Sequence, residues 1–161
     1  MSRVPAPDVS IRRGRAADAG GILALEAAFP SDRMSARSVR RFLGVPSARV
    51  LIADRAGEVA GALILLLRRN SHWARIYSVA VDPRYRGCGL GRRLVEAAHG
   101  LARRERRQGV SLEVRADNVA ALGLYRGLGY VEAARLPAYY EDGAPGIRLR
   151  KPFGRPRRTR R

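Results

Sequence analysis

Three glycines at alternating positions mark the segment whose residue types point most directly to binding chemistry. They lie in Arg86-Gly87-Cys88-Gly89-Leu90-Gly91, between an apolar run typical of a strand and an amphipathic helical pattern. The free amide groups and positive end of a helix attract anions, and glycines let the backbone approach them closely. The segment therefore predicts a phosphate-binding turn; a tight strand-to-helix connection without a ligand is the structural alternative.

The glycine spacing differs from two common phosphate-binding motifs. A dinucleotide-binding turn has the pattern Gly-x-Gly-x-x-Gly with an acidic residue about 20 residues further on. Here the glycines fall at positions 87, 89 and 91. A Walker loop requires Gly-Lys-Ser or Gly-Lys-Thr, which the sequence lacks. The spacing excludes both of these ligand classes, but the loop alone does not identify its own ligand.

The segments around the loop complete a longer pattern. They are Val79-Ala80-Val81-Asp82-Pro83, Leu112-Glu113-Val114-Arg115-Ala116-Asp117-Asn118, Leu124-Tyr125 and Leu128-Gly129-Tyr130. Together with the loop they resemble the GNAT superfamily of acetyltransferases, and most closely its RimI-type enzymes, which acetylate the N-terminal alanine of a small-subunit ribosomal protein. The resemblance is specific over residues 76–130, looser to residue 140 and poor over the first 50 residues.

The resemblance implies acetyl-CoA as the cofactor. The backbones of Val79 and Val81 would hydrogen-bond the pantetheine arm from a strand that splays from its neighbour. Backbone amides of the glycine loop would bind the pyrophosphate, and Asn118 would contact the cofactor near its thiol end. The implied cofactor-binding residues are Val79, Ala80, Val81, Arg86, Gly87, Cys88, Gly89, Leu90, Gly91, Arg92 and Asn118.

The resemblance also implies two catalytic residues, Glu113 as general base and Tyr125 as general acid. A neutral amine must attack the thioester, and since an α-amine has a pKa of about 8, a carboxylate acting directly or through one water suffices. A phenol near the sulfur could donate a proton to the departing thiolate, whose thiol pKa is roughly 8.5. The structural alternatives are that Glu113 pairs with Arg115 and that Tyr125 only packs on a helix.

The sequence says less about the acceptor amine. In this superfamily the first helices and the last hairpin set acceptor specificity. Phe29-Pro30 resembles the RimI-type N-terminal region, although residues 31–35 depart from it. Tyr139 and Tyr140 resemble the paired tyrosines of RimI-like enzymes, so we expect Phe29 and both tyrosines to contact the acceptor; packing at the solvent edge is the alternative. The expected acceptor is a protein N-terminal α-amine, with a small-molecule amine, a lysine or an aminoacyl-tRNA as alternatives.

Hydrophobic periodicity predicts a single α/β domain that positions these residues. We expect strands at residues 9–12, 49–54, 58–68, 74–81, 111–115, 130–135 and 146–150, and helices at 16–29, 35–44, 91–107 and 118–128. Ser35 and Asn118 are placed as N-caps, and Gly129 suits a left-handed position after its helix. The order β-α-α-β-β-β-α-β-α-β-β indicates a GNAT-like fold, with a mixed, largely antiparallel central sheet flanked by helices.

The chain of 161 residues carries a formal net charge of +18, and Lys151 is its only lysine. The electric field of so positive a protein would attract RNA or an anionic cofactor. The alternative is a general preference for Arg, which would scatter the same charges over every solvated face. Residues 151–161 carry six cations and no acid. We therefore expect a domain at residues 1–150 and a disordered basic tail at 151–161, which could contact nucleic acid or the ribosome, or only aid solubility. A non-catalytic RNA- or ribosome-binding module is the alternative from another class.

Other features narrow the class of protein. No apolar run approaches the roughly 18 residues of a membrane-spanning helix, and the N-terminus lacks the apolar core of a signal peptide. The single cysteine, Cys88, rules out an intrachain disulfide or a multi-cysteine metal site and is assigned no nucleophilic role. His72 and His99 have no spacing that suggests a metal. We expect a cytoplasmic protein without metal or membrane contact, as a monomer or homodimer.

Overall fold

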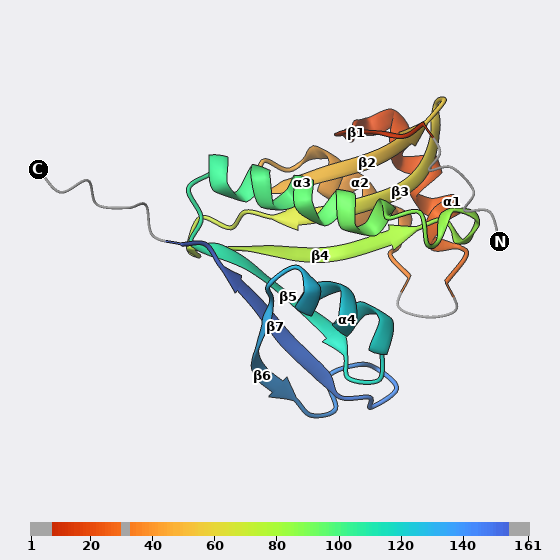
Figure 1. The fold of residues 1–161 in the computed structure, drawn as a ribbon. Helices are drawn as coiled ribbons and strands as arrows, with labels where there is room; N and C mark the ends of the chain where they lie inside the picture. Colours follow the sequence, from red (N-terminus) through yellow and green to blue (C-terminus); the bar gives the residue numbers. More distant parts are fainter. Residues whose placement is uncertain (1–7, 30–32, 155–161) are drawn as a thin grey trace, which may run out of the picture.

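The computed structural model describes residues 8–29 and 33–154, and a single seven-stranded sheet runs through it (Figure 1). The strands are β1 (Ser10–Arg13), β2 (Ala48–Arg55), β3 (Glu58–Leu66), β4 (Trp73–Val81), β5 (Gly109–Arg115), β6 (Val131–Leu136) and β7 (Gly146–Pro152). Their spatial order is β1-β2-β3-β4-β5-β7-β6. Every neighbouring pair is antiparallel except β4 and β5, which are parallel. The predicted mixed, largely antiparallel sheet is confirmed.

Helices cover both faces of the sheet. They are α1 (Ala19–Glu26), α2 (Ala36–Gly44), α3 (Leu90–Arg104) and α4 (Val119–Gly127), with short 3-10 helices η1 (Ala16–Asp18) and η2 (Pro83–Tyr85). Helices α1 and α2 share one buried cluster with β2 and β3, whereas α3 and α4 share a second cluster on the opposite face. The predicted element order is confirmed. Among the described residues no helix is both long and apolar enough to cross a membrane.

Strand β3 is the centre of the core and is buried on both faces. Leu63 and Leu65 belong to the cluster under α3, whereas Ile64 and Leu66 belong to the cluster under α1 and α2. Successive side chains of a strand point to opposite faces, so a strand covered on both sides must be apolar throughout. This explains the uninterrupted apolar run in this part of the sequence. Each such side chain contributes roughly 1.5–3 kcal/mol on burial.

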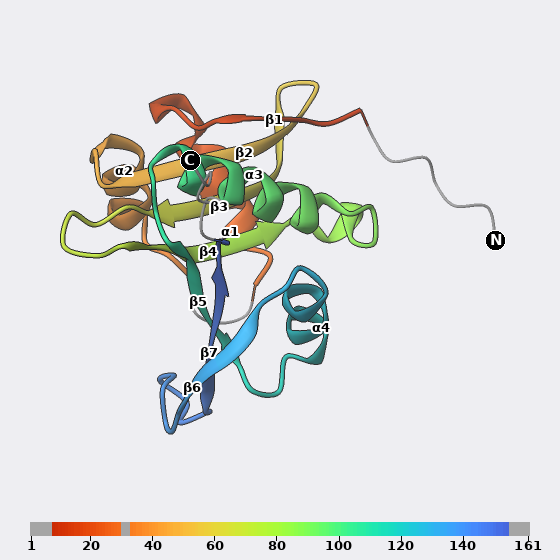
Figure 2. The same cartoon turned by 60° about the vertical axis from the view of Figure 1, so that its left-hand side comes forward.

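The two halves of the sheet diverge from a narrow junction between β4 and β5 (Figures 1 and 2). Their parallel pairing is limited to Trp73 with Gly109, Ala74 with Val110 and Arg75 with Ser111. Beyond these pairs β4 continues along β3, and β5 continues along β7. A gap therefore opens between the C-terminal parts of β4 and β5. The first arm of the sheet comprises β1–β4, and the second comprises β5–β7.

Gly109 is required at the narrow end of this gap. A Cβ atom at this position would lie 2.3 Å from the carbonyl oxygen of Lys151 and 2.5 Å from the ring of Trp73. Neither distance is compatible with a real side chain, and the first involves backbone that cannot move without shifting β7. The absence of a side chain thus allows β4, β5 and β7 to meet at one point.

The predicted helix caps are confirmed. Ser35 Oγ accepts a hydrogen bond from the Ser38 amide at 3.1 Å, and Asn118 Oδ1 accepts one from the Ala121 amide at 3.1 Å. Each bond satisfies an amide that would otherwise lack a partner in the first helical turn. Gly129 has a φ of +93°, the left-handed conformation predicted after α4.

Several element boundaries differ from the sequence prediction, and contacts in the structure account for two of these differences. The helix expected at residues 16–29 is the 3-10 turn η1 followed by α1, which ends at Glu26. Buried Asp18 accepts hydrogen bonds from Arg12 and from the amide of Arg15, and these contacts fix the turn. Because η1 is tied to β1 in this way, the α-helix begins only afterwards, at Ala19.

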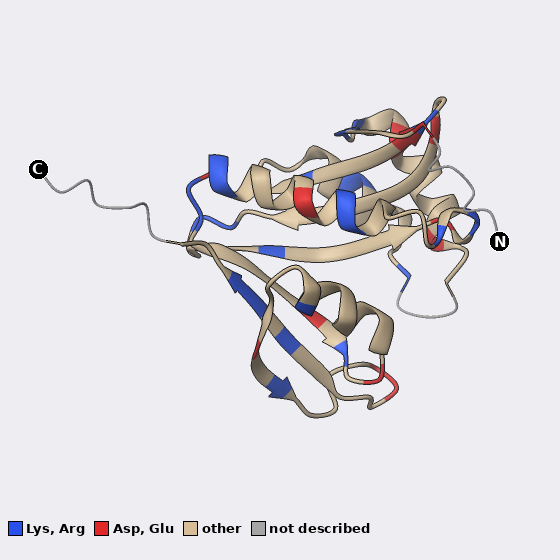
Figure 3. Cartoon of the chain, viewed as in Figure 1, with Lys and Arg blue, Asp and Glu red and all other residues tan. Residues whose placement is uncertain are grey.

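The second difference concerns the predicted start of the basic tail at residue 151. Lys151 and Pro152 belong to β7, and Lys151 Nζ donates a hydrogen bond to the carbonyl of Leu128 at 2.6 Å. The guanidinium of Arg103 lies 4.3 Å from the ring centroid of Phe153. These residues are therefore part of the fold, while residues 155–161 of the predicted tail lie outside the described residues. Elsewhere, basic residues occur on helices and strands of both arms (Figure 3).

Candidate active site

The edge of β4 that faces the gap carries backbone groups without a strand partner. The amide of Asp82 donates to the carbonyl of Ala60 on β3 at 2.9 Å. Backbone groups of successive residues point to opposite edges of a strand, so those of Val79 and Val81 point away from β3 and toward the gap. Such an unpaired edge can bind an extended chain that offers amide groups of its own.

The glycine loop lies between the end of β4 and the start of α3. Gly87 and Gly89 have φ values of +79° and +78°, and Gly89 is the N-cap of α3. A Cβ atom at either position would meet nothing within 4 Å, so these glycines are needed for backbone conformation and leave the loop surface open. The first amides of α3 have no partner within the helix. The loop therefore has the form of an anion-binding turn.

Three elements meet at the first turn of α3. A Cβ atom built on Gly91 would lie 3.8 Å from Val81 on β4 and 3.9 Å from Leu124 on α4. Cys88 is half-buried and packs against the core cluster under α3. The unpaired edge of β4, the N-terminus of α3 and one side of α4 thus lie at the same end of the gap.

Asn118 has a defined structural role at the start of α4. Its Oδ1 atom caps the helix by accepting the hydrogen bond from Ala121. The backbone amide of Asn118 donates to the carbonyl of Arg115 at 3.0 Å and its carbonyl accepts from the amide of Leu122 at 3.0 Å, so the cofactor contact implied by the sequence resemblance falls most directly to its Nδ2 group.

Tyr125 is buried on α4, with its ring 5.3 Å from that of Tyr130 in an edge-to-face arrangement. Its hydroxyl makes no hydrogen bond with another residue in the described part of the chain. Burial raises the pKa of Tyr125 to about 12, so the phenol is neutral at physiological pH. Complete proton transfer from this phenol to a thiolate whose thiol pKa is roughly 8.5 would cost about 5 kcal/mol. Its chemistry is better suited to donating a hydrogen bond to a developing thiolate.

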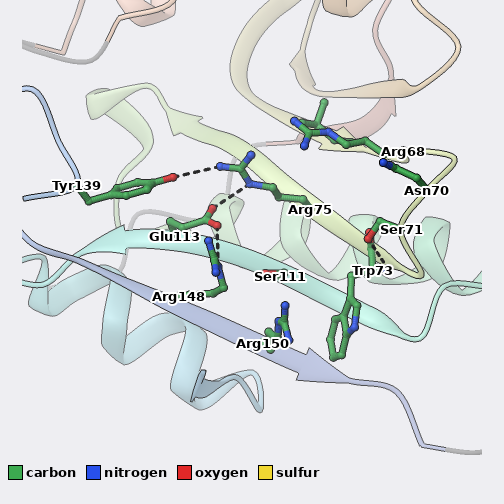
Figure 4. A pocket seen from close by; sticks show the side chains of 11 residues that line it. Arg68, Asn70, Ser71, Trp73, Arg75, Ser111, Glu113, Tyr139, Arg148 and Arg150 are labelled. Atoms are coloured by element: carbon green, nitrogen blue, oxygen red, sulfur yellow. Dashed lines mark hydrogen bonds and ion pairs between the residues drawn. The ribbon is translucent and has the colours of Figure 1, made fainter. Parts of the chain in front are cut away.

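Glu113 lies between two arginines (Figure 4). Arg75 Nε lies 2.9 Å from Glu113 Oε2, and Arg148 Nε lies 3.1 Å from Oε1. The side chain of Glu113 is only 7% exposed. Arg148 is the residue directly opposite Glu113 on β7, so sheet register creates this pair. Arg115, the partner considered from the sequence, pairs instead with Asp142 at 2.5 Å.

Glu113 and Tyr125 lie on opposite faces of the sheet. Leu112 and Val114 belong to the core cluster that contains Tyr125, whereas Glu113, between them in β5, points to the other face. A reactant that contacts both residues must therefore pass through the gap between β4 and β5. Sequence resemblance names the two residues, and the fold supplies this route between them.

A cavity of about 520 Å³ lies on the Glu113 face, between α2 and the loop that joins β6 to β7. Its lining residues are Arg33, Met34, Ser35, Ser38, Arg75, Tyr77, Ser78, Glu113, Tyr139 and Tyr140. The rings of Tyr139 and Tyr140 are 5.1 Å apart, edge to face. We call this the acceptor cavity. Of the residues expected to contact the acceptor, both tyrosines line it, whereas Phe29 packs against the core under α1 and α2.

A second cavity of about 420 Å³ adjoins the first and shares Arg75, Glu113 and Tyr139 with it. It extends over Arg148 and Arg150 of β7. Sequence reasoning did not select these arginines. A signal was present, because Arg148 and Arg150 alternate with Ile147 and Leu149 and must share the face opposite the core.

The buried histidine has a structural contact. His99 Nε2 lies 2.7 Å from the hydroxyl of Tyr130, which joins α3 to the start of β6. Burial lowers the pKa of His99 to about 4, with further lowering by Lys151 and Arg103. The imidazole is thus neutral at physiological pH. In the described part of the chain no cluster of His, Cys, Asp or Glu could hold a metal ion.

Comparison with known proteins agrees with this geometry. Residues 22–130, more than half of the chain, match the model of the acetyltransferase (GNAT) family. The chain is 40% identical over 82 residues to the N-alpha-acetyltransferase RimI of Mycobacterium tuberculosis, and this match spans only 50% of each protein. It is 30% identical over 134 residues to a Bacillus subtilis protein named for ribosomal protein bS18-alanine N-acetyltransferase activity, covering 83% of this chain and 87% of that protein.

A solved structure extends the likeness to the complete fold. The crystal structure of the ribosomal-protein-S18-alanine N-acetyltransferase from Escherichia coli superimposes with a TM-score of 0.84 at 26% identity. The superposition covers 95% of this chain and 99% of that one.

Proposed function

Because the chain belongs to the acetyltransferase (GNAT) family, we propose that it transfers the acetyl group of acetyl-CoA to the N-terminal α-amine of a protein. The observation that carries this proposal is the gap between β4 and β5. It joins an unpaired strand edge and a helix N-terminus to a cavity that holds a buried carboxylate. The relatives named for N-terminal acetylation support a polypeptide acceptor.

The residues around the gap fit acetyl-CoA. The backbone groups of Val79 and Val81 would pair with the amides of the pantetheine arm. The open loop at Gly87 and Gly89 and the first amides of α3 would hold the pyrophosphate, with Arg86 and Arg92 adding positive charge. When bound, acetyl-CoA supplies a thioester that a neutral amine can attack.

The two catalytic residues would act from opposite sides of the gap. In the acceptor cavity, both oxygens of Glu113 are already paired with arginines, so we infer that Glu113 accepts the amine proton through a bridging water. On the other face, the neutral hydroxyl of Tyr125 would donate a hydrogen bond to the sulfur as negative charge develops there. Tyr139 and Tyr140 would form a wall beside the acceptor backbone.

Binding of the cofactor is tested by calorimetry with acetyl-CoA. We expect saturable binding, and the absence of binding at millimolar acetyl-CoA would remove the basis of the proposal. It would instead favour a non-catalytic basic module.

The acceptor class is tested with an acetylation screen of N-terminal peptides, lysine peptides whose α-amine is blocked, and polyamines. The peptide of ribosomal protein bS18 belongs in this screen because of the names of the relatives. We expect transfer to free α-amines. A preference for lysine or polyamines would replace the proposed acceptor while leaving the acetyl-CoA site intact.

A further inference from the structure

The second cavity beside Glu113 is lined by four arginines and by one acid, Glu113 itself, so it has an excess of positive charge. We propose that it binds a carboxylate side chain at the second or third residue of the acceptor polypeptide. The inference rests on the proposed function, because it assigns a sequence preference to the same acceptor. We call this cavity the arginine cavity.

Charge in the arginine cavity is unbalanced. Arg68, Arg75, Arg148 and Arg150 line it, and Glu113 is the only acid among its lining residues. Glu113 is occupied by Arg75 and Arg148. Within residues 8–29 and 33–154, neither Arg68 nor Arg150 forms an ion pair with a carboxylate. Two guanidinium groups therefore remain available to an anion.

Arg150 is held in place and lacks an acceptor. Its guanidinium carbon lies 4.8 Å from the ring centroid of Trp73, and the two side chains lie side by side in Figure 4. Its Nε atom is buried and has no hydrogen-bond partner in the described part of the chain. Burying an N–H without an acceptor is unfavourable, and a hydrogen bond to a carboxylate is stronger than one to a neutral group. Because Nε itself is buried, a ligand carboxylate in the cavity that Arg150 lines would accept from its terminal N–H groups, and its charge would stabilise the whole guanidinium.

The position of Arg150 indicates which acceptor residue would reach it. Arg150 is two residues beyond Arg148 on β7, and Arg148 pairs with the proposed base, Glu113. Two residues of a strand span about 7 Å, and an extended peptide advances about 3.4 Å per residue. If the terminal amine lies near Glu113, the side chain of the second or third residue lies near Arg150.

Burial favours a peptide carboxylate over the phosphates of a nucleic acid. Backbone contacts with nucleic acid use several accessible cations along a surface. Here Glu113 holds Arg75 and Arg148, and of the other two arginines only Arg68 is exposed, whereas Arg150 is half-buried against Trp73. The arginine cavity also continues directly into the acceptor cavity, along which the acceptor must lie.

Steady-state acetylation of matched peptides tests the inference. The peptides begin with Ala and differ only in having Glu, Gln or Lys at position 2 or position 3. We expect kcat/KM to be about tenfold higher with Glu than with Gln at the better position, and lowest with Lys. In Arg150→Gln the Glu-to-Gln ratio should fall to about two. In the control Arg104→Gln, which removes an exposed charge at the end of α3, the ratio should remain about ten.

Trp73 gives a second measurement that does not depend on turnover. It is the only tryptophan in the chain and lies against Arg150, so its fluorescence should report on the arginine cavity. N-acetylated peptides, which cannot react, are titrated into the protein. We expect a saturable change with the Glu peptide that is at least fivefold weaker with the Gln peptide and is lost in Arg150→Gln.

The possible outcomes separate the inference from the function on which it rests. Equal kcat/KM values and equal titrations for Glu and Gln peptides overturn the inference and leave the function standing. Tighter binding of inorganic phosphate or an RNA oligonucleotide than of the Glu peptide also overturns it. If no peptide is acetylated, the proposed function fails, while the titrations still decide whether the cavity selects a carboxylate.

Discussion

The two sides of the gap differ in the kind of chemical group that lines them: backbone groups on one side and side chains on the other. On the donor side, defined here as the edge of β4, the glycine loop, α3 and α4, the groups that we propose bind acetyl-CoA are backbone groups positioned by glycines and helix caps. On the acceptor side, comprising the acceptor and arginine cavities, the groups that we propose bind the acceptor are charged and aromatic side chains brought together from α2, β4, β5, β7 and the β6–β7 loop. Backbone groups are common to every chain of this fold, whereas side-chain groups can vary. The difference suggests a fixed cofactor and an adjustable acceptor.

The strongest test of this comparison alters the junction that both sides share. Gly109→Ala places a Cβ atom 2.3 Å from the carbonyl of Lys151, which should destabilise the fold by about 3 kcal/mol. Gly100→Ala, in the open middle of α3 with nothing within 4 Å, is the matched control. It should stabilise the fold by about 0.5–1 kcal/mol. Urea unfolding measures both, and equal midpoints for the two variants would show that the junction is not constrained as described.

Glu113→Gln should separate the two sides. It keeps the shape of the side chain but removes the charge that would accept the proton, so we expect kcat to fall about 100-fold. The donor side is untouched, and the dissociation constant for acetyl-CoA should change less than twofold. Calorimetry and initial rates measure the two quantities.

Glu132→Gln, at an exposed position on β6, is the control and should keep full activity. An unchanged kcat in Glu113→Gln would leave Glu113 as a structural partner of Arg75 and Arg148. A parallel loss of acetyl-CoA affinity would show that the substitution disturbs the whole gap.

The same contrast explains what could be predicted from the sequence. The glycine loop, the caps at Ser35 and Asn118 and the strand expected at residues 58–68 are encoded by neighbouring residues, and all are found in the structure. The partners of Glu113 come from residues 38 and 35 positions away. Their contact depends on sheet register, which no local pattern reveals. Local patterns likewise do not reveal that Glu113 and Tyr125 lie on opposite faces of the sheet, because this also depends on how distant segments pack.

His99 lies on α3, on the donor side, and we expect its titration to make the stability of the fold depend on pH. The pKa of His99 is lowered to about 4 in the folded protein, mainly by burial, from the value of 6.5 that is usual for an exposed histidine. Between pH 4 and pH 6.5 His99 is protonated more in the unfolded state than in the folded state. The contribution of neutral His99 to the free energy of unfolding is therefore fully present above pH 6.5 and is lost as the pH falls toward 4. We expect a loss of about 2 kcal/mol over this range. Urea unfolding at several pH values measures it.

The matched variants are His99→Gln and His72→Gln. Replacement of His99 should flatten this part of the stability profile, whereas replacement of the exposed His72 should not. A profile that is unchanged in His99→Gln would assign the pH dependence to the paired carboxylates instead.

Tyr125 and Tyr130 allow the smallest and most selective test, because their rings are in contact but their hydroxyls differ. Tyr130→Phe removes the hydrogen bond to His99 and should cost about 1 kcal/mol of stability without changing kcat. Tyr125→Phe removes a hydroxyl with no partner in the described residues, so stability should change little. The same change should lower kcat about tenfold, since a hydrogen bond to the developing thiolate is lost. If both variants behave alike in rate and in stability, Tyr125 is a packing residue, and the donor side contributes only binding while the acceptor side contributes the chemistry.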